Sequence, residues 1–166
     1  LMFFNQLIRN LPIQIKLFLG IAVMSLSIGY FTGLTFVLQS ESETPKGIIE
    51  NYNGNEYLPD SKIMKFKKSH REILIIIHTH VLSISIILLI IGSLVWKTEI
   101  KGSMKAFLTI EPFFSLIVTF GGIYLIWMGY EYFAYLVMFS GSLMTITYLF
   151  SVFIIFSALS KPPQSK

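Results

Sequence analysis

The sequence predicts an all-α integral membrane protein, folded as a four-transmembrane-helix antiparallel bundle. Of its 166 residues, 54% are apolar and only 13% are charged, against about 25% charged in an average soluble domain. The mean hydropathy is +0.68, and four long apolar runs contain no Lys, Arg, Asp or Glu. A soluble domain of this size could not bury so much apolar surface. A cytosolic globular enzyme and a disordered chain are therefore both excluded.

The apolar runs give the expected membrane spans, because a helix needs about 20 apolar residues to cross a bilayer. We place the spans at about 14–38, 73–96, 107–128 and 132–159, in a single membrane domain covering 1–166. The third run is short, so we extend it past Glu111 and expect Pro112 to start or kink that helix. The tight turn that follows makes the third and fourth spans antiparallel neighbours.

The segment 39–72 is the only long connection, and we expect it to be a loop. Lys and Arg are slightly more numerous on the side of the two termini, which favours cytoplasmic termini and an outer position for 39–72. The net charge of +4 comes from basic residues that flank the apolar runs. This pattern is typical of membrane anchoring, and no nucleic-acid-binding motif accompanies it.

Three histidines and the absence of cysteine limit the possible chemistry. Without cysteine the chain has no disulfide, thiolate metal site or covalently attached c-type haem. His78 and His80 fall inside the second span, where an imidazole costs free energy unless it has a partner. Residues at i and i+2 point about 200° apart on a helix, so the two rings cannot ligate one metal ion together.

Several interpretations of these histidines stay open. His78 or His80 could ligate the iron of a b-type haem. The second iron ligand could come from a partner chain, could be absent, or could be His70 if that residue folds back toward the haem. An imidazole could instead bond to a quinone carbonyl. In the alternative, the histidines have a purely structural role without a cofactor. Each ring then forms a hydrogen bond with a hydroxyl or a backbone carbonyl on a neighbouring helix.

Other polar and small residues predict packing rather than chemistry. Glu111 and Glu131 are expected to lie at the membrane interfaces as solvated anchors, which leaves no carboxylate in mid-span and argues against a carboxylate-driven pump or channel. Small residues allow close helix contact in a membrane, either within the bundle or with a partner subunit. The candidates are Ser25, Gly29, Gly33, Gly122 and Gly141.

Several stretches resemble a set of small, poorly characterised four-span bacterial membrane proteins. They are 47–54 (GIIENYNG), 67–74 (KKSHREIL), 78–83 (HTHVLS), 111–113 (EPF) and 121–124 (GGIY), within a loose similarity over 12–159. The resemblance implies association with bacterial electron-transfer components, some relatives carrying a cytochrome-like insertion in the first loop.

The resemblance favours a multi-pass protein of the bacterial inner membrane. The expected function is a non-catalytic subunit of an electron-transfer complex, with haem b or quinone held through the second-span histidines. The alternative is a cofactor-free structural or assembly subunit. In both cases the expected partners are the lipid bilayer and other membrane subunits, and nucleic acid is not expected.

Overall fold

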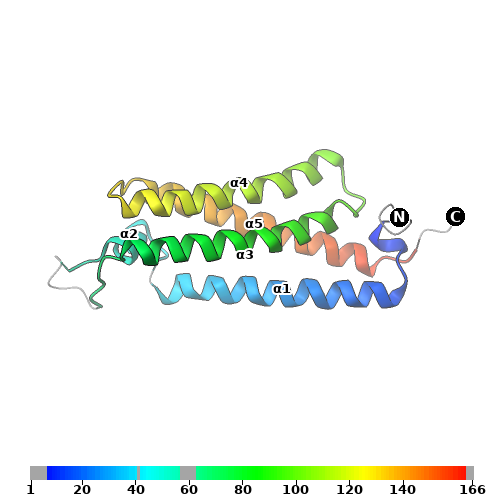
Figure 1. Cartoon of the computed structure of the whole chain (residues 1–166). Coiled ribbons are helices and arrows are strands. Elements are labelled where there is room, and N and C mark those ends of the chain that lie inside the picture. Colours follow the sequence, from blue (N-terminus) through cyan, green and yellow to red (C-terminus); the bar gives the residue numbers. More distant parts are fainter. Residues whose placement is uncertain (1–6, 41, 57–62, 164–166) are drawn as a thin grey trace.

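The computed structural model describes residues 7–40, 42–56 and 63–163, and within these ranges helix is the only regular secondary structure. The elements are η2 (Ile8–Asn10), α1 (Ile13–Gln39), α2 (Pro45–Asn53), α3 (His70–Val95), α4 (Gly102–Trp127) and α5 (Phe133–Ser160). All but η2 and α2 are long and apolar enough to cross a membrane. These four helices lie side by side (Figure 1). The all-α, four-span prediction is confirmed.

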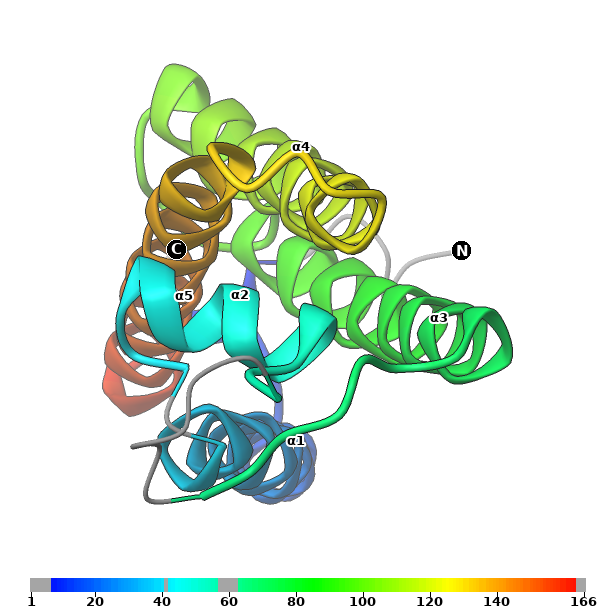
Figure 2. The ribbon, with the colours of Figure 1, turned by 90° about the vertical axis from the view of Figure 1, so that its left-hand side faces the viewer.

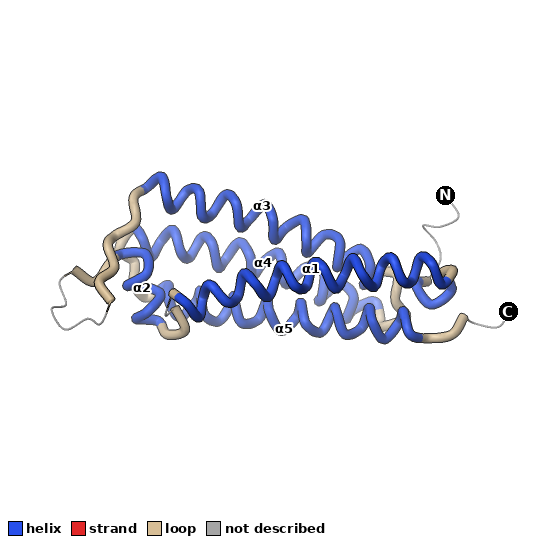
Figure 3. Tube along the Cα trace, turned by 90° about the horizontal axis from the view of Figure 1, so that it is seen from below, coloured by secondary structure: helices blue, strands red, loops and turns tan. Residues whose placement is uncertain are grey.

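The spans alternate in direction. Figure 3 shows α2 and the segment 63–69 at one end of the bundle, with η2 and the end of α5 at the other. The core lies mainly between α4 and α5, where Leu116, Phe120 and Ile126 are buried together with Val137 and Tyr148. By contrast, α1 buries only Lys16, Val23 and Tyr30. It is the least embedded of the four spans.

Helix α4 does not start at Pro112 but runs through it from Gly102. Of the two expected effects of Pro112, starting the helix or kinking it, the first is therefore wrong. Proline has a backbone angle that suits a helix, and it removes only one backbone donor, a loss that packing against neighbouring helices can offset in a membrane. The first part of α4 leans away from α5 (Figure 1).

The segment 39–72 is not simply a loop, because it contains helix α2. Thr44 caps this helix by accepting a 3.0 Å hydrogen bond from the Gly47 N–H, and Pro45 occupies the first helical position. Both are ordinary helix-start signals. Figure 2 shows α2 lying across the end of the bundle, where it buries Ile48.

Side-chain amides hold the end of α2 against α4 and fold the chain that follows it. Asn53 donates a 2.7 Å hydrogen bond to the Ile126 carbonyl, while Asn55 donates to Ile63 O at 3.0 Å and accepts from Lys65 N at 2.7 Å. Between them, Gly54 has a φ of +81°, and a Cβ there would lie 2.7 Å from the Lys67 nitrogen. Only glycine fits this close turn. The described part of the segment 39–72 is thus a folded cap on this end of the bundle.

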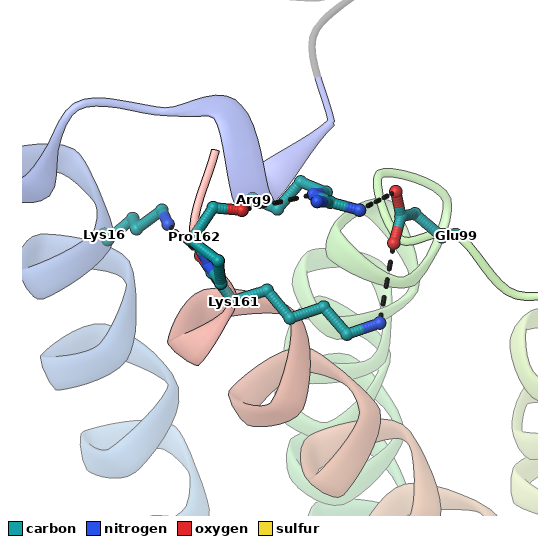
Figure 4. A network of polar contacts seen from close by, with 5 residues as sticks. All are labelled: Arg9, Lys16, Glu99, Lys161 and Pro162. Carbon is teal, nitrogen blue, oxygen red and sulfur yellow. Dashed lines mark hydrogen bonds and ion pairs between the residues drawn. The ribbon is translucent and has the colours of Figure 1, made fainter. Parts of the chain in front are cut away.

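A second polar cluster joins the chain near its two ends to the α3–α4 connection (Figure 4). The Arg9 guanidinium lies 2.7 Å from one Glu99 carboxylate oxygen, and the Lys161 ammonium lies 3.5 Å from the other. Lys16 donates a 2.7 Å hydrogen bond to the Lys161 carbonyl. These contacts place both ends of the described chain and the α3–α4 connection on one side of the bundle.

Candidate functional site

The three histidines are all exposed and lie at different heights along α3. The His70 ring stacks on Trp127 of α4 at a centroid distance of 5.2 Å and an interplanar angle of 18°. His78 lies on the exposed surface of α3, as does His80. Within the part of the chain that the structure covers, no three His, Asp or Glu side chains gather to hold a metal ion.

His80 has a defined orientation. Its Nδ1 lies 2.8 Å from the carbonyl oxygen of Ile76, one turn earlier on the same helix, and its ring centroid lies 5.5 Å from that of Phe120 on α4. A carbonyl can only accept, so in the neutral imidazole Nδ1 carries the proton and Nε2 has the lone pair. The carbonyl partner expected on a neighbouring helix is instead on α3 itself.

Glu111 is not a solvated residue at a helix end, and in this respect the expectation of a solvated anchor is wrong. Because α4 begins at Gly102, Glu111 is about two and a half turns inside the helix. One of its oxygens accepts a hydrogen bond from Ser115, one turn further along, and the other lies 2.7 Å from the hydroxyl of Thr147. Thr147 occupies the middle of α5. The bundle interior therefore holds a half-buried carboxyl.

The sequence contains a signal that could have located this carboxyl. A Ser four residues after a Glu lies on the same helix face, and Ser115 stands at that spacing from Glu111. The sequence interpretation placed the start of this span at about 107, so Glu111 fell only about one turn inside it. The helix itself begins at Gly102, which adds more than one turn of helix before Glu111.

Further hydroxyl pairs bridge the helices near Glu111. Thr119 of α4 lies 2.7 Å from Ser140 of α5, and the Tyr30 hydroxyl of α1 lies 3.2 Å from Thr145 of α5. Tyr30 is also within electrostatic range of Glu111. Such bonds hold membrane helices together where the hydrophobic effect cannot, because lipid is as apolar as the side chains.

The small residues divide into two groups. A Cβ at Gly122 would lie 2.6 Å from Val137 Cγ2, and one at Gly141 would lie 4.0 Å from Thr119, so both glycines stand at the α4–α5 contact. On α1 there is no atom within 4 Å of such a Cβ at Gly29 or Gly33. These two glycines and Ser25 lie on the exposed face of α1.

The fold and its four apolar helices define the class as a small multi-span membrane protein in contact with the lipid bilayer. A model of the Aq_1264_TM family, described as a transmembrane helical domain, matches residues 42–166, which is more than half of the chain. The chain belongs to this family. No curated protein and no solved structure matches it.

Proposed function

We propose that the chain is a non-catalytic integral membrane subunit of an electron-transfer complex in the bacterial inner membrane, with its termini in the cytoplasm. The observation that supports this proposal best is the geometry of His80. Its Nδ1–H is occupied by the Ile76 carbonyl at 2.8 Å, so a neutral imidazole offers the Nε2 lone pair from an exposed ring. The ring stands within a span that otherwise holds few polar groups.

This arrangement suits an axial ligand of haem b. Histidines that bind metals almost always donate their other ring N–H to a carbonyl or a carboxylate, which fixes the tautomer and makes the ligand more basic. A bound haem would supply one-electron transfer, and this chain would supply the ligand and apolar surroundings that include Phe120. The other spans contain no histidine. A second histidine ligand would therefore come from a partner subunit.

The same lone pair suits a quinol. A quinol hydroxyl can donate a hydrogen bond to Nε2 of His80, whereas a quinone carbonyl would need a donor that this tautomer does not offer. His78 is the second candidate on α3, because its ring is also exposed. The stacking of His70 on Trp127 makes it the weakest of the three candidates.

A specific observation favours the alternative, a cofactor-free structural or assembly subunit. Ser25, Gly29 and Gly33 form an exposed small-residue face on α1, and among the described residues no atom of another helix lies within 4 Å of a Cβ added at either glycine. Small residues at spacing four let a second helix come close. In this alternative, α1 would bind another membrane subunit, and the histidines would have no redox role.

The test is a reduced-minus-oxidised absorption spectrum of the complex purified through a tagged copy of this chain. We expect a haem b band that disappears in His80→Ala and persists in His78→Ala, the variant of the second candidate. If no haem is present, the co-purified lipid extract should contain a quinone that is lost only in His80→Ala. A wild-type complex that is colourless and quinone-free, with both variants assembling normally, would contradict the redox role and leave the structural one.

A further inference from the structure

We propose that Glu111 is a proton-binding site in the membrane interior, and that the carboxyl takes up its proton on the oxygen that faces Thr147. This site is separate from the α3 histidines and does not depend on any cofactor. Three features of the bundle carry the proposal. They are the lack of a cationic partner, the number of hydrogen atoms available at Thr147, and the small number of oxygen atoms around the carboxyl.

The first feature is charge. Within the described ranges, the ion pairs found involve Glu50 and Glu99, and no Lys or Arg pairs with Glu111. Helix α5 contains no charged residue. The titratable groups nearest on the packed helices are Tyr30 of α1 and Tyr148 stacked on it from α5.

On α3, the nearest titratable group is His80, which contacts α4 at Phe120, more than two turns beyond Glu111. None of these three groups offers a permanent positive charge. An anionic carboxylate in the hydrocarbon region without a cation costs several kcal/mol. A proton removes this cost, because the neutral acid needs only hydrogen bonds.

The second feature is a count of hydrogen atoms. The Thr147 hydroxyl oxygen lies 2.7 Å from a Glu111 carboxylate oxygen, 2.9 Å from the Leu143 carbonyl and 3.0 Å from the Met144 carbonyl. Threonine has one hydroxyl hydrogen and all three neighbours are acceptors. When that hydrogen goes to a backbone carbonyl, the Glu111 contact requires a hydrogen on the carboxyl instead.

The site therefore accepts both protonation states without moving a heavy atom. In the charged state, Thr147 donates to Glu111. In the neutral state, Glu111 donates to Thr147, which turns its own hydrogen to Leu143 or Met144. Ser115 donates to the other carboxylate oxygen, which leaves the oxygen facing Thr147 to hold the proton.

The third feature argues for a proton over a metal cation. Hard cations take six or more oxygen ligands in proteins. Glu111 has two side-chain hydroxyls as hydrogen-bond partners, those of Ser115 and Thr147, and one of these also contacts backbone carbonyls of its own helix. These few oxygen atoms are enough to share one proton with the carboxyl, but they are too few to form the coordination shell of a hard metal cation.

The test is labelling by dicyclohexylcarbodiimide, an apolar reagent that reaches protonated carboxyls in membranes. The acid proton moves to a carbodiimide nitrogen, the carboxyl oxygen bonds to the central carbon, and the acyl group then shifts to nitrogen. Nothing leaves, so the peptide gains the mass of one reagent molecule. The protein is labelled in native membranes over a series of pH values and analysed by peptide mass spectrometry.

We expect Glu111 to be labelled, with labelling falling about tenfold for each pH unit above its midpoint. Glu111→Gln should abolish the adduct, and Glu131→Gln in the α4–α5 connection should leave it unchanged. Ser115→Ala removes a donor to the charged form, so labelling should persist to a higher pH than in the wild type. Thr119→Ala is the matched control, since Thr119 bonds to Ser140.

Three results would overturn the proposal. They are no adduct on Glu111 at any pH, an adduct whose yield does not depend on pH, and protection by sodium chloride at fixed pH where choline chloride has no effect. The last would indicate a metal cation site. The wild-type pH series needs no variant, so misfolding of Glu111→Gln would not leave the question open. A missing haem band would not affect the outcome.

Discussion

Tyr30 of α1 stacks on Tyr148 of α5, with ring centroids 4.1 Å apart and planes inclined by 11°. Each hydroxyl reaches the opposite helix, Tyr30 to Thr145 at 3.2 Å and Tyr148 to Ser27 at 3.1 Å. Both tyrosines are buried, while α1 buries little else. This reciprocal pair is therefore the main attachment of α1 to the rest of the bundle.

Replacing one ring of this pair should loosen α1. We expect Tyr148→Ala to lower the free energy of unfolding by about 3–5 kcal/mol, the usual cost of removing a buried aromatic ring. Tyr30→Phe keeps the stacked ring and loses one hydrogen bond, so it should cost only about 0.5–1.5 kcal/mol. Thermal unfolding in detergent, followed by circular dichroism, compares the two. Equal effects would show that the hydroxyl bonds, and not the stacked rings, hold α1.

The close contact of α4 and α5 depends on Gly122. Its Cβ would lie 2.6 Å from Val137 Cγ2, and a buried valine has little rotamer freedom with which to move away. We expect Gly122→Ala to destabilise the bundle by about 1–3 kcal/mol, as overpacking does in other cores. The adjacent Gly121 is a matched control, because nothing lies within 4 Å of its Cβ.

The double variant Gly122→Ala with Val137→Ala tests whether the clash with Val137 causes the effect of Gly122→Ala. Removing the two valine methyl groups should relieve the clash, so the double variant should be more stable than the sum of the two single effects predicts. The melting temperatures of all four forms provide the comparison. Simple additivity would mean that Gly122 does not act through Val137.

The spans could be predicted because their signal is local. A run such as 132–159, without a single charge, needs no knowledge of its neighbours to be assigned as a membrane helix. Helix α2 was missed although Thr44 and Pro45 signalled its start, because it is short and weakly apolar. Its stability comes from packing at the end of the bundle, which no local pattern reports.

The candidate site could be predicted only in part. The histidines of the second span are visible as polar residues in an apolar run, but their exposure depends on how α3 rotates against α4. For Glu111, depth depended on where α4 begins, and its bond to Thr147 joins segments 36 positions apart. Register between helices is a property of tertiary packing. Sequence periodicity does not determine it.

The ion pairs of Glu99, at the end of the bundle where the two chain ends lie, predict a salt-dependent contribution to the stability of the fold. The hydrogen bond from the Arg9 guanidinium, with a smaller contribution from Lys161, holds the pKa of the Glu99 carboxyl below its usual value of 4.5. A carboxyl with a lowered folded-state pKa stabilises the fold above its unfolded pKa, and this stabilisation is lost as the pH falls through the folded value.

We therefore expect the wild type to lose melting temperature when salt is raised at neutral pH, since exposed ion pairs are screened. Glu99→Gln should be slightly less stable than the wild type at low salt and should respond less to salt and to acid. Melting temperatures at two salt concentrations and at two pH values, one below the Glu99 pKa, give the comparison. Parallel responses in both proteins would assign the salt effect elsewhere.

Tyr52 of helix α2, in the folded cap, gives the protein a pH-dependent stability at high pH. Burial raises the pKa of Tyr52 from 10.0 to about 12. Between these values the unfolded chain has released the phenolic proton and the folded chain has kept it, so stability falls as the pH rises. The loss approaches about 2–3 kcal/mol above pH 12. Tyr52→Phe removes this ionisation, so it should keep more of its stability over that interval. Unfolding measured at pH 9, 10 and 11.5 in the two proteins isolates the contribution of Tyr52. Curves that fall in parallel would show that the cap exposes this hydroxyl to water.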